Sequence, residues 1–370
     1  MTTRPKVFLD AVYWDVRSRN MDWRYVRYTM PLLANFEPDL QFVTPRSAAL
    51  TLAGNFEAIA VALGRRIGIH QSMSSLATGH LSRAELQRSQ ANLIYTRTYP
   101  LNAGDIPIVW SNAIVDPAMQ LSYGVTPAVL QQEIAAKSPL FQRCAHVCMY
   151  TQAEVYRHIA TFPDAADRFV HTPMFAPHIH ACTSATLEKH RNADPVRILF
   201  VGNHALRKGL QQLLEAFLNL PASIQSRALL TVISNFDRSR HINLPTHDRI
   251  RILRGAPSAQ VMQQMAESHI FVNVAHFESY GLVFHEAMSQ GLAILGPQWE
   301  VQRELLDNGN AGLNLPCETS AIGAALERLI VDEEERYRMA HAAWQRFQIH
   351  LAAPVSAAKY HEVFCSVLES

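Results

Sequence analysis

Short apolar runs alternate with helical stretches along most of the chain, and this alternation restricts the folds open to it. The clearest run covers residues 196–201 and ends at Gly202. The other runs in this half are residues 228–233, 250–253, 270–274 and 293–295. Stretches with helical spacing separate them, as they do where crossover helices join the strands of a parallel sheet. The sequence therefore predicts an α/β fold with doubly wound parallel sheets.

Apolar runs in the first half predict a second sheet. Its strands are expected at residues 6–13, 40–43, 58–63, 93–95, 106–110 and 146–150, and its helices at residues 23–34, 127–137 and 152–160. A length of 370 residues favours two domains over one. The polar stretch 188–195 has the composition of a linker. We expect Rossmann-like domains over residues 1–190 and 196–348, and a last helix over residues 349–370.

Composition excludes several classes of protein. The net charge is +1 with histidines neutral, which gives no field to attract nucleic acid. No uninterrupted apolar window reaches about 18 residues and the N-terminus lacks a signal peptide's apolar core, so we expect no membrane span and a cytoplasmic location. The five cysteines are scattered, which fits a reducing compartment. Cys144 and Cys148 lack further zinc ligands nearby, and we interpret them as buried thiols.

A basic pair stands where a helix is expected to begin. Helical spacing of apolar residues from Leu210 onwards places the helix start near Lys208, with Arg207 beside it. Cations at this end oppose the helix dipole, and an anion shared by the helix end and both side chains would remove the conflict. Charge placement alone leaves two interpretations open, an anion site or a solvated pair.

Two glutamates flank a glycine turn between two apolar runs. Glu278 lies in the loop before Gly281, where a helix is expected to begin, and Glu286 lies within that helix. The helix is apolar on nearly all sides, so the carboxylate of Glu286 needs hydrogen-bond donors. The free N–H groups of Gly281, Leu282 and Val283 form an anion site, and carboxylates suit the hydroxyls of a sugar. Either glutamate alone could instead be a solvated or structurally paired residue.

Together, these segments resemble the donor-binding domain of retaining GT-B glycosyltransferases, in particular glycosyltransferase family 4. The resemblance covers about residues 196–346. Its residues are Gly202, Arg207-Lys208-Gly209, the stretch from Glu278 to Met288 with seven residues between its two glutamates, and the glycine-bearing turn 307–312. The sequence departs from the family at Asn203, where many members have a basic residue, and at Val274-Ala275, which replaces the usual Pro-Ser.

The resemblance implies a role for each of these residues. Arg207 and Lys208 would hold the donor diphosphate, with backbone donors from Gly281, Leu282 and Val283. Glu286 would bind the ribose diol and Glu278 would face the transferred sugar. Gly202 and Asn203 would line the donor site, and Gly255 would let the base approach the backbone. The last helix would pack back onto the first domain.

The first half is more divergent, and its acceptor-side candidates are Asn112 and Asp116. The acceptor is expected to be a saccharide or a lipid-linked saccharide. The stretch 13–28 mixes five aromatic residues with four arginines, so it could rest on a membrane surface, or it could be an ordinary loop and helix. No Asp-x-Asp pair occurs, so no metal and no other cofactor is expected.

The resemblance implies a hexosyltransferase of polysaccharide biosynthesis that retains anomeric configuration. The donor would be a nucleoside diphosphate sugar, and no nucleic acid is expected as a partner. Two alternatives remain open. One is a catalytically silent GT-B module that binds a sugar nucleotide or a partner protein, and the other is a sugar-nucleotide epimerase of the same fold.

Overall fold

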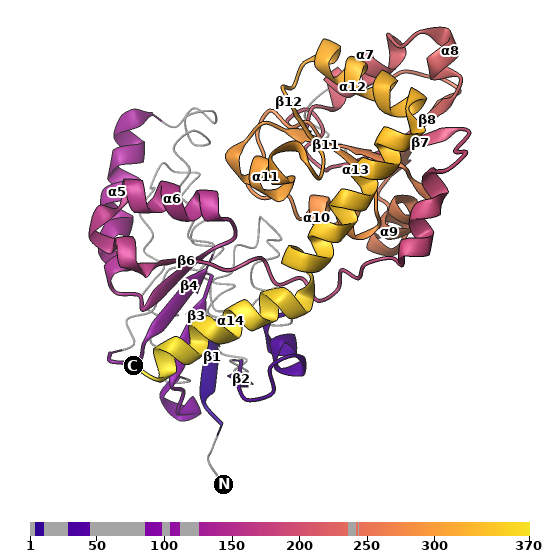
Figure 1. Cartoon of the computed structure of the whole chain (residues 1–370). Helices are drawn as coiled ribbons and strands as arrows, with labels where there is room; N and C mark the ends of the chain where they lie inside the picture. Colours follow the sequence, from indigo (N-terminus) through magenta and orange to yellow (C-terminus); the bar gives the residue numbers. More distant parts are fainter. Residues whose placement is uncertain are drawn as a thin grey trace. The chain divides into compact units, whose positions relative to one another are not determined.

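The computed structural model describes residues 4–10, 29–44, 86–97, 104–111, 126–235, 242 and 244–370. The chain forms two compact units (Figure 1). The first joins Met1–Pro177 to Ala353–Ser370, and the second is His178–Ala352. The expected strand at 58–63 lies outside the described residues, as does the stretch 13–28. No helix in the described ranges is both long and apolar enough to cross a membrane.

The first unit is built on a parallel sheet of six strands in the order β2-β1-β3-β4-β5-β6. The strands are β1 (Lys6–Asp10), β2 (Gln41–Val43), β3 (Leu93–Thr96), β4 (Ile108–Ser111), β5 (His146–Met149) and β6 (Phe169–His171). The helices are η2 (Met30–Asn35), α5 (Pro127–Gln142), α6 (Gln152–Thr161), η3 (Pro163–Arg168) and α14 (Ala353–Leu368).

The second unit has its own parallel sheet of six strands, in the order β12-β11-β10-β7-β8-β9. The strands are β7 (Val196–Val201), β8 (Ala228–Ser234), β9 (Ile250–Arg254), β10 (Ile270–Val272), β11 (Ala293–Pro297) and β12 (Leu313–Leu315). The helices are η4 (Ser184–His190), α7 (Leu210–Leu218), α8 (Ala222–Gln225), α9 (Ser258–Glu267), α10 (Leu282–Ser289), α11 (Glu300–Leu305), η5 (Asp307–Gly309), α12 (Thr319–Val331), α13 (Glu333–Arg346) and η6 (Phe347–Leu351). The predicted α/β fold with doubly wound parallel sheets is confirmed.

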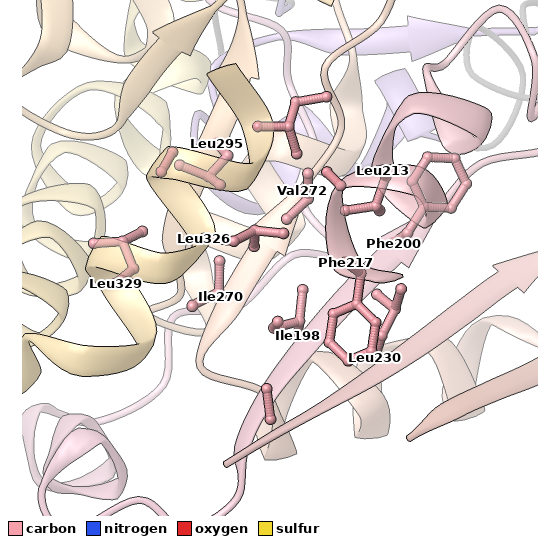
Figure 2. Packing of buried hydrophobic residues seen from close by; sticks show 14 of the residues in the cluster. Ile198, Phe200, Leu213, Phe217, Leu230, Ile270, Val272, Leu295, Leu326 and Leu329 are labelled. Carbon is pink, nitrogen blue, oxygen red and sulfur yellow. The ribbon is translucent and has the colours of Figure 1, made fainter. Parts of the chain in front are cut away.

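Burial on both faces explains why the strands of the second sheet are so apolar. Ile198 and Phe200 of β7 pack against α7 through Leu213 and Phe217 (Figure 2). Leu326 and Leu329 of α12 pack on the same core. The opposite face is covered too, since the ring of Phe271 in β10 meets that of Phe284 in α10 edge to face at 5.6 Å. A central parallel strand is therefore apolar throughout, because neither of its faces contacts solvent.

The last helix, α14, belongs to the first unit. This confirms the expectation that the end of the chain packs back onto the first domain. Figure 1 shows α14, in yellow, along the first sheet. Its Tyr360 and Phe364 pack edge to face against Tyr95 of β3, with ring centroids 5.9 and 5.8 Å apart. These three aromatic residues lie in one buried cluster with Val7 and Leu9 of β1. Apolar burial of this size fixes the helix to the sheet.

The two compact units divide between Pro177 and His178, before the polar stretch 188–195 that we expected to be the linker. His190 in this stretch is fully buried within the second unit. Its carbonyl accepts a hydrogen bond of 2.9 Å from Arg336 of α13, and its Nε2 lies 2.8 Å from the carbonyl oxygen of Gly291. His190 is therefore polar because it is hydrogen-bonded inside the unit, whereas Glu188, Asn192 and Asp194 of the same stretch are exposed.

Candidate functional site

The carboxyl ends of β7 and β10 bring the two predicted motifs together. The basic turn follows β7, and the loop that contains Glu278 follows β10, the neighbouring strand. Helix α7 begins at Leu210, two residues later than predicted, because Gly209 takes a left-handed conformation with φ +76°. Arg207 and Lys208 therefore lie in the turn that leads into the helix.

Two hydrogen bonds hold this basic turn against the loop after β10. The N–H of His276 donates to the carbonyl of Arg207 at 2.9 Å, and Nη1 of Arg207 donates to the carbonyl of Phe277. A Cβ at Gly209 would lie 2.3 Å from the carbonyl oxygen of Val274. Gly209 is thus required both by its φ angle and by the close approach of the second loop.

Lys208 and Glu278 form a shielded ion pair. Nζ of Lys208 lies 2.9 Å from Oε2 of Glu278, and their side chains are only 14% and 7% exposed. Lys208 crosses Gly202 to reach this carboxylate, since a Cβ at Gly202 would fall 2.4 Å from Cδ of Lys208. The pair joins a cation expected to bind phosphate with a carboxylate expected to face a sugar. A ligand with both groups would therefore contact both side chains at one place.

The start of α10 adds backbone donors beside this pair. Gly281 precedes the helix with φ +81°, and the N–H groups of Leu282 and Val283 open the first turn, where the helix supplies no acceptor. A Cβ at Gly281 would meet Cγ of Glu278 at 3.1 Å, so the turn and the carboxylate are adjacent. The predicted backbone donors and Glu278 are thus brought together. A helix start of this kind favours a phosphate or carboxylate ligand.

Glu286, one turn further along α10, lines a pocket of about 240 Å³ at the same edge of the sheet. Asn203 after β7, Asn235 after β8 and Ser258 at the start of α9 also line it. Gly255, at φ +65°, directly precedes another lining residue, Ala256. The pocket has polar groups on several elements and space for part of a ligand next to the basic turn.

Burial of Glu286 raises the pKa of its carboxyl from 4.5 to about 7, while the positive charge of Lys208 acts in the opposite direction. The side chain therefore changes charge near neutral pH. In its ionised form it offers two acceptor oxygens to hydroxyl groups in the pocket.

The acceptor-side candidates Asn112 and Asp116 lie outside the described residues. The described edge of the first sheet holds polar residues that the sequence analysis did not select. Asp10 ends β1 and is 2% exposed, and Thr96 of β3 donates to its Oδ2 at 3.3 Å. Arg97, which follows β3, is also buried, with its guanidinium 5.6 Å from the centre of the Tyr150 ring.

These residues lie where the strand order of the first sheet reverses, between β1 and β3. Open α/β sheets bind ligands at such a switch point. The signal in the sequence was a charged residue at or just after the end of an apolar strand, at Asp10 and again at Arg97.

No group of three His, Cys, Asp or Glu side chains among the described residues gathers where it could hold a metal ion. All five cysteines are free thiols. Cys144 and Cys148 are buried, and burial raises the pKa of each to about 12. This agrees with our interpretation of the two as buried thiols.

Residues 185–346 match the family model of group 1 glycosyl transferases. No curated protein matches the chain. Solved structures with similar folds include a sucrose-phosphate synthase from Thermosynechococcus elongatus, at 13% identity and TM-score 0.70 over 99% of this chain and 100% of that one. Anabaena HepE in complex with UDP and glucose is 15% identical, at TM-score 0.65 over 98% and 100%. WaaG, a glycosyltransferase involved in lipopolysaccharide biosynthesis, is 16% identical, at TM-score 0.60 over 97% and 99%.

The fold is therefore that of the GT-B glycosyltransferases. The family match falls on the unit that carries the basic turn and the two glutamates. Family match and fold together support sugar transfer.

Proposed function

We propose that this chain is a retaining glycosyltransferase of family 4 that takes a hexose from a nucleoside diphosphate sugar. One observation carries the proposal: Lys208, Glu278 and the start of α10 meet at one edge of the second sheet, beside the pocket lined by Glu286. In such a donor a diphosphate links the transferred sugar on one side to the ribose on the other. The site offers cations and N–H groups for the first and a carboxylate for each of the others.

The arrangement suits the charges that develop during transfer. Breaking the glycosidic bond to the diphosphate leaves positive charge at the anomeric carbon and negative charge on the leaving group. Arg207, Lys208 and the first-turn N–H groups of α10 would stabilise the leaving diphosphate. Glu278 would lie on the sugar side, and Glu286 would accept hydrogen bonds from the ribose diol. The pocket between Asn203 and Asn235 would take the base. Such a site needs no metal ion to neutralise the diphosphate.

For the acceptor, a saccharide or a lipid-linked saccharide, we propose the switch point of the first sheet. Asp10 and Arg97 offer an acceptor and a donor of hydrogen bonds there, as sugar hydroxyls require. A lipid-linked acceptor would bring the protein to a membrane surface.

The proposal is tested by incubating the full chain with UDP-, GDP- and ADP-glucose without an acceptor. UDP-glucose comes first because HepE was also solved with that compound. We expect slow release of free glucose and nucleoside diphosphate from one of the three, unaffected by EDTA and reduced in Lys208→Ala. Isomerisation of the sugar would instead indicate an epimerase. Saturable binding without any turnover, also in the presence of saccharide acceptors, would indicate a silent binding module.

A further inference from the structure

Tyr280, in the loop between Glu278 and Gly281, makes hydrogen bonds to two different helices. Tyr280 is 6% exposed. Its hydroxyl lies 2.8 Å from Nε2 of His285, on the first two turns of α10. Its carbonyl accepts a hydrogen bond of 2.8 Å from Nε2 of Gln302, on α11. Tyr280 thus ties the loop to two helices at once.

The surroundings of His285 make its hydrogen bond with the Tyr280 hydroxyl important. This side chain is fully buried in an apolar helix, and burial lowers its pKa to about 3, so the imidazole is neutral. Its other ring nitrogen, Nδ1, has no hydrogen-bond partner among the described residues. Tyr280 therefore supplies the one hydrogen bond that the structure gives to this imidazole, and losing it would leave a buried polar group without a partner.

The second attachment reaches the same loop from α11. Gln302 is fully buried, and its amide group is directed at the carbonyl of Tyr280. On the far side of Glu278, the ring of Phe277 meets that of Trp299, the residue before α11, edge to face at 5.5 Å. Glu278 therefore lies in a short loop that is held on both sides.

We infer that Tyr280 is a positioning residue, whose hydroxyl fixes the direction in which Glu278 presents its carboxylate. The inference rests on the proposed function. A lysine on a flexible stem, such as Lys208, neutralises the carboxylate but does not set its direction. A carboxylate that must face one carbon atom of a donor needs a rigid support, because small displacements of reacting groups reduce rates steeply.

A purely structural role for the Tyr280–His285 bond predicts something different. In that case, Tyr280→Phe lowers activity only because it lowers stability. Removing the orphaned imidazole as well, in Tyr280→Phe/His285→Leu, would then restore both stability and turnover. If the bond positions the loop, the double variant regains stability, since both polar partners are gone. Its turnover stays low, because the hydroxyl bond that fixes the loop to α10 is still missing.

The experiment compares four full-length proteins: wild type, Tyr280→Phe, the double variant, and Tyr337→Phe as a control. Tyr337 is a matched control because its hydroxyl also donates to a side chain of this unit, Oε1 of Glu188 at 3.4 Å, away from the site. Hydrogen exchange of the amides 279–283, thermal unfolding, UDP affinity and UDP-glucose hydrolysis are measured for each.

In Tyr280→Phe we expect faster amide exchange, and a kcat for hydrolysis reduced by about 10- to 100-fold, the range for losing a hydrogen bond that aligns a charged group. UDP affinity should change by about threefold or less, because the partner of the hydroxyl is His285 of α10 and not a residue of the proposed diphosphate site. The double variant should unfold close to the wild-type temperature and keep the low kcat. The control should match wild type throughout.

Two results would overturn the inference. One is recovery of kcat in the double variant together with stability. The other is unchanged exchange of the loop in Tyr280→Phe, which counts against positioning whether or not wild type turns over the donor. If wild type hydrolyses no nucleotide sugar while the loop of Tyr280→Phe exchanges faster, the proposed function fails and the positioning bond stands.

Discussion

The two sheets have the same architecture but different carboxyl edges. The edge of the second sheet carries four glycines, Gly202, Gly209, Gly255 and Gly281, and protein atoms approach the backbone closely at three of them, Gly202, Gly209 and Gly281. At the described edge of the first sheet no strand ends at a glycine, and side chains such as Asp10 fill the switch point instead.

The difference matches what each edge would bind. The diphosphate is the same in every nucleoside diphosphate sugar, and backbone N–H groups at a glycine turn suit it in any of them. Acceptors differ between enzymes, and side chains can be exchanged one by one to suit them. A backbone site leaves a fixed spacing of glycines in the sequence, whereas a side-chain site leaves no fixed pattern. The comparison therefore predicts that substitutions at the two edges act on different steps.

The largest effect is expected at the edge of the second sheet, from Glu278→Gln. If Glu278 faces the anomeric carbon as proposed, loss of its charge weakens the transition state more than the bound donor, so kcat should fall by roughly 10- to 100-fold. Glu286→Gln should mainly raise the KM for the donor, because the ribose contact is equal in both states. Steady-state kinetics with the donor varied measure both. A change in KM alone for Glu278→Gln, or in kcat alone for Glu286→Gln, would contradict this division.

A glycine from each unit sharpens the comparison further. In Gly209→Ala the new Cβ clashes with the carbonyl of Val274, and the positive φ is strained as well. In Gly104→Ala, in the first unit, the φ of +66° is strained but nothing lies within 4 Å of the new Cβ. The φ alone costs about 1–2 kcal/mol, and the clash adds about 1–3 kcal/mol. Thermal unfolding should show the larger loss for Gly209→Ala, with UDP affinity lost as well. Equal losses in both variants would show that the basic turn can shift away from the loop after β10.

A smaller, pH-dependent effect is expected from Glu286. Burial raises its pKa in the folded protein to about 7. The protonated side chain therefore contributes its full stability below the pKa of the unfolded chain, and this contribution is lost as the pH rises through about 7. Glu286→Gln should therefore unfold at a higher temperature than wild type at pH 8 but not at pH 4. Ionisation also creates the acceptor for the diol, so the KM for UDP-glucose should fall by up to roughly tenfold between pH 6 and pH 8. A variant that keeps this pH dependence would remove Glu286 from the ribose site.

The smallest effect on the donor is expected at the first edge. Asp10→Asn keeps the size of the side chain and lies in the other compact unit. UDP affinity and acceptor-free hydrolysis should stay within about twofold of wild type, a change of less than half a kcal/mol. Transfer to a saccharide acceptor should fall. Titration with UDP and a coupled transfer assay separate the two readouts, and a tenfold loss of UDP affinity would show that the division between the edges is wrong.

Most of the second sheet could be predicted because its four central strands are buried on both faces and stand out as apolar runs. The pair Glu278 and Glu286 could be predicted because both lie within one strand–turn–helix segment. Contacts between distant segments could not. The ion pair between Lys208 and Glu278 depends on how closely the loop after β10 approaches Gly209, and no local pattern encodes that distance.

Two further features escaped prediction for other physical reasons. Tyr280, in the loop before α10, and His285, within that apolar helix, both resemble ordinary core residues in the sequence, and only the hydrogen bond between them sets them apart. The stretch 188–195 has the composition of a loop, although His190 and its carbonyl are buried and hydrogen-bonded. Composition reports which groups are polar, whereas the fold decides whether water or protein satisfies them.

The central claim is that the second unit binds the diphosphate of the donor through Lys208. Calorimetric titration of the full chain with UDP, for wild type, Lys208→Ala and the exposed first-unit control Lys359→Ala, tests it most directly. We predict saturable binding by wild type and by Lys359→Ala, and an affinity lower by about 10- to 150-fold in Lys208→Ala, from the loss of a charge-assisted hydrogen bond of about 1.5–3 kcal/mol. Equal UDP affinity in Lys208→Ala and wild type, with both proteins folded, would contradict the account.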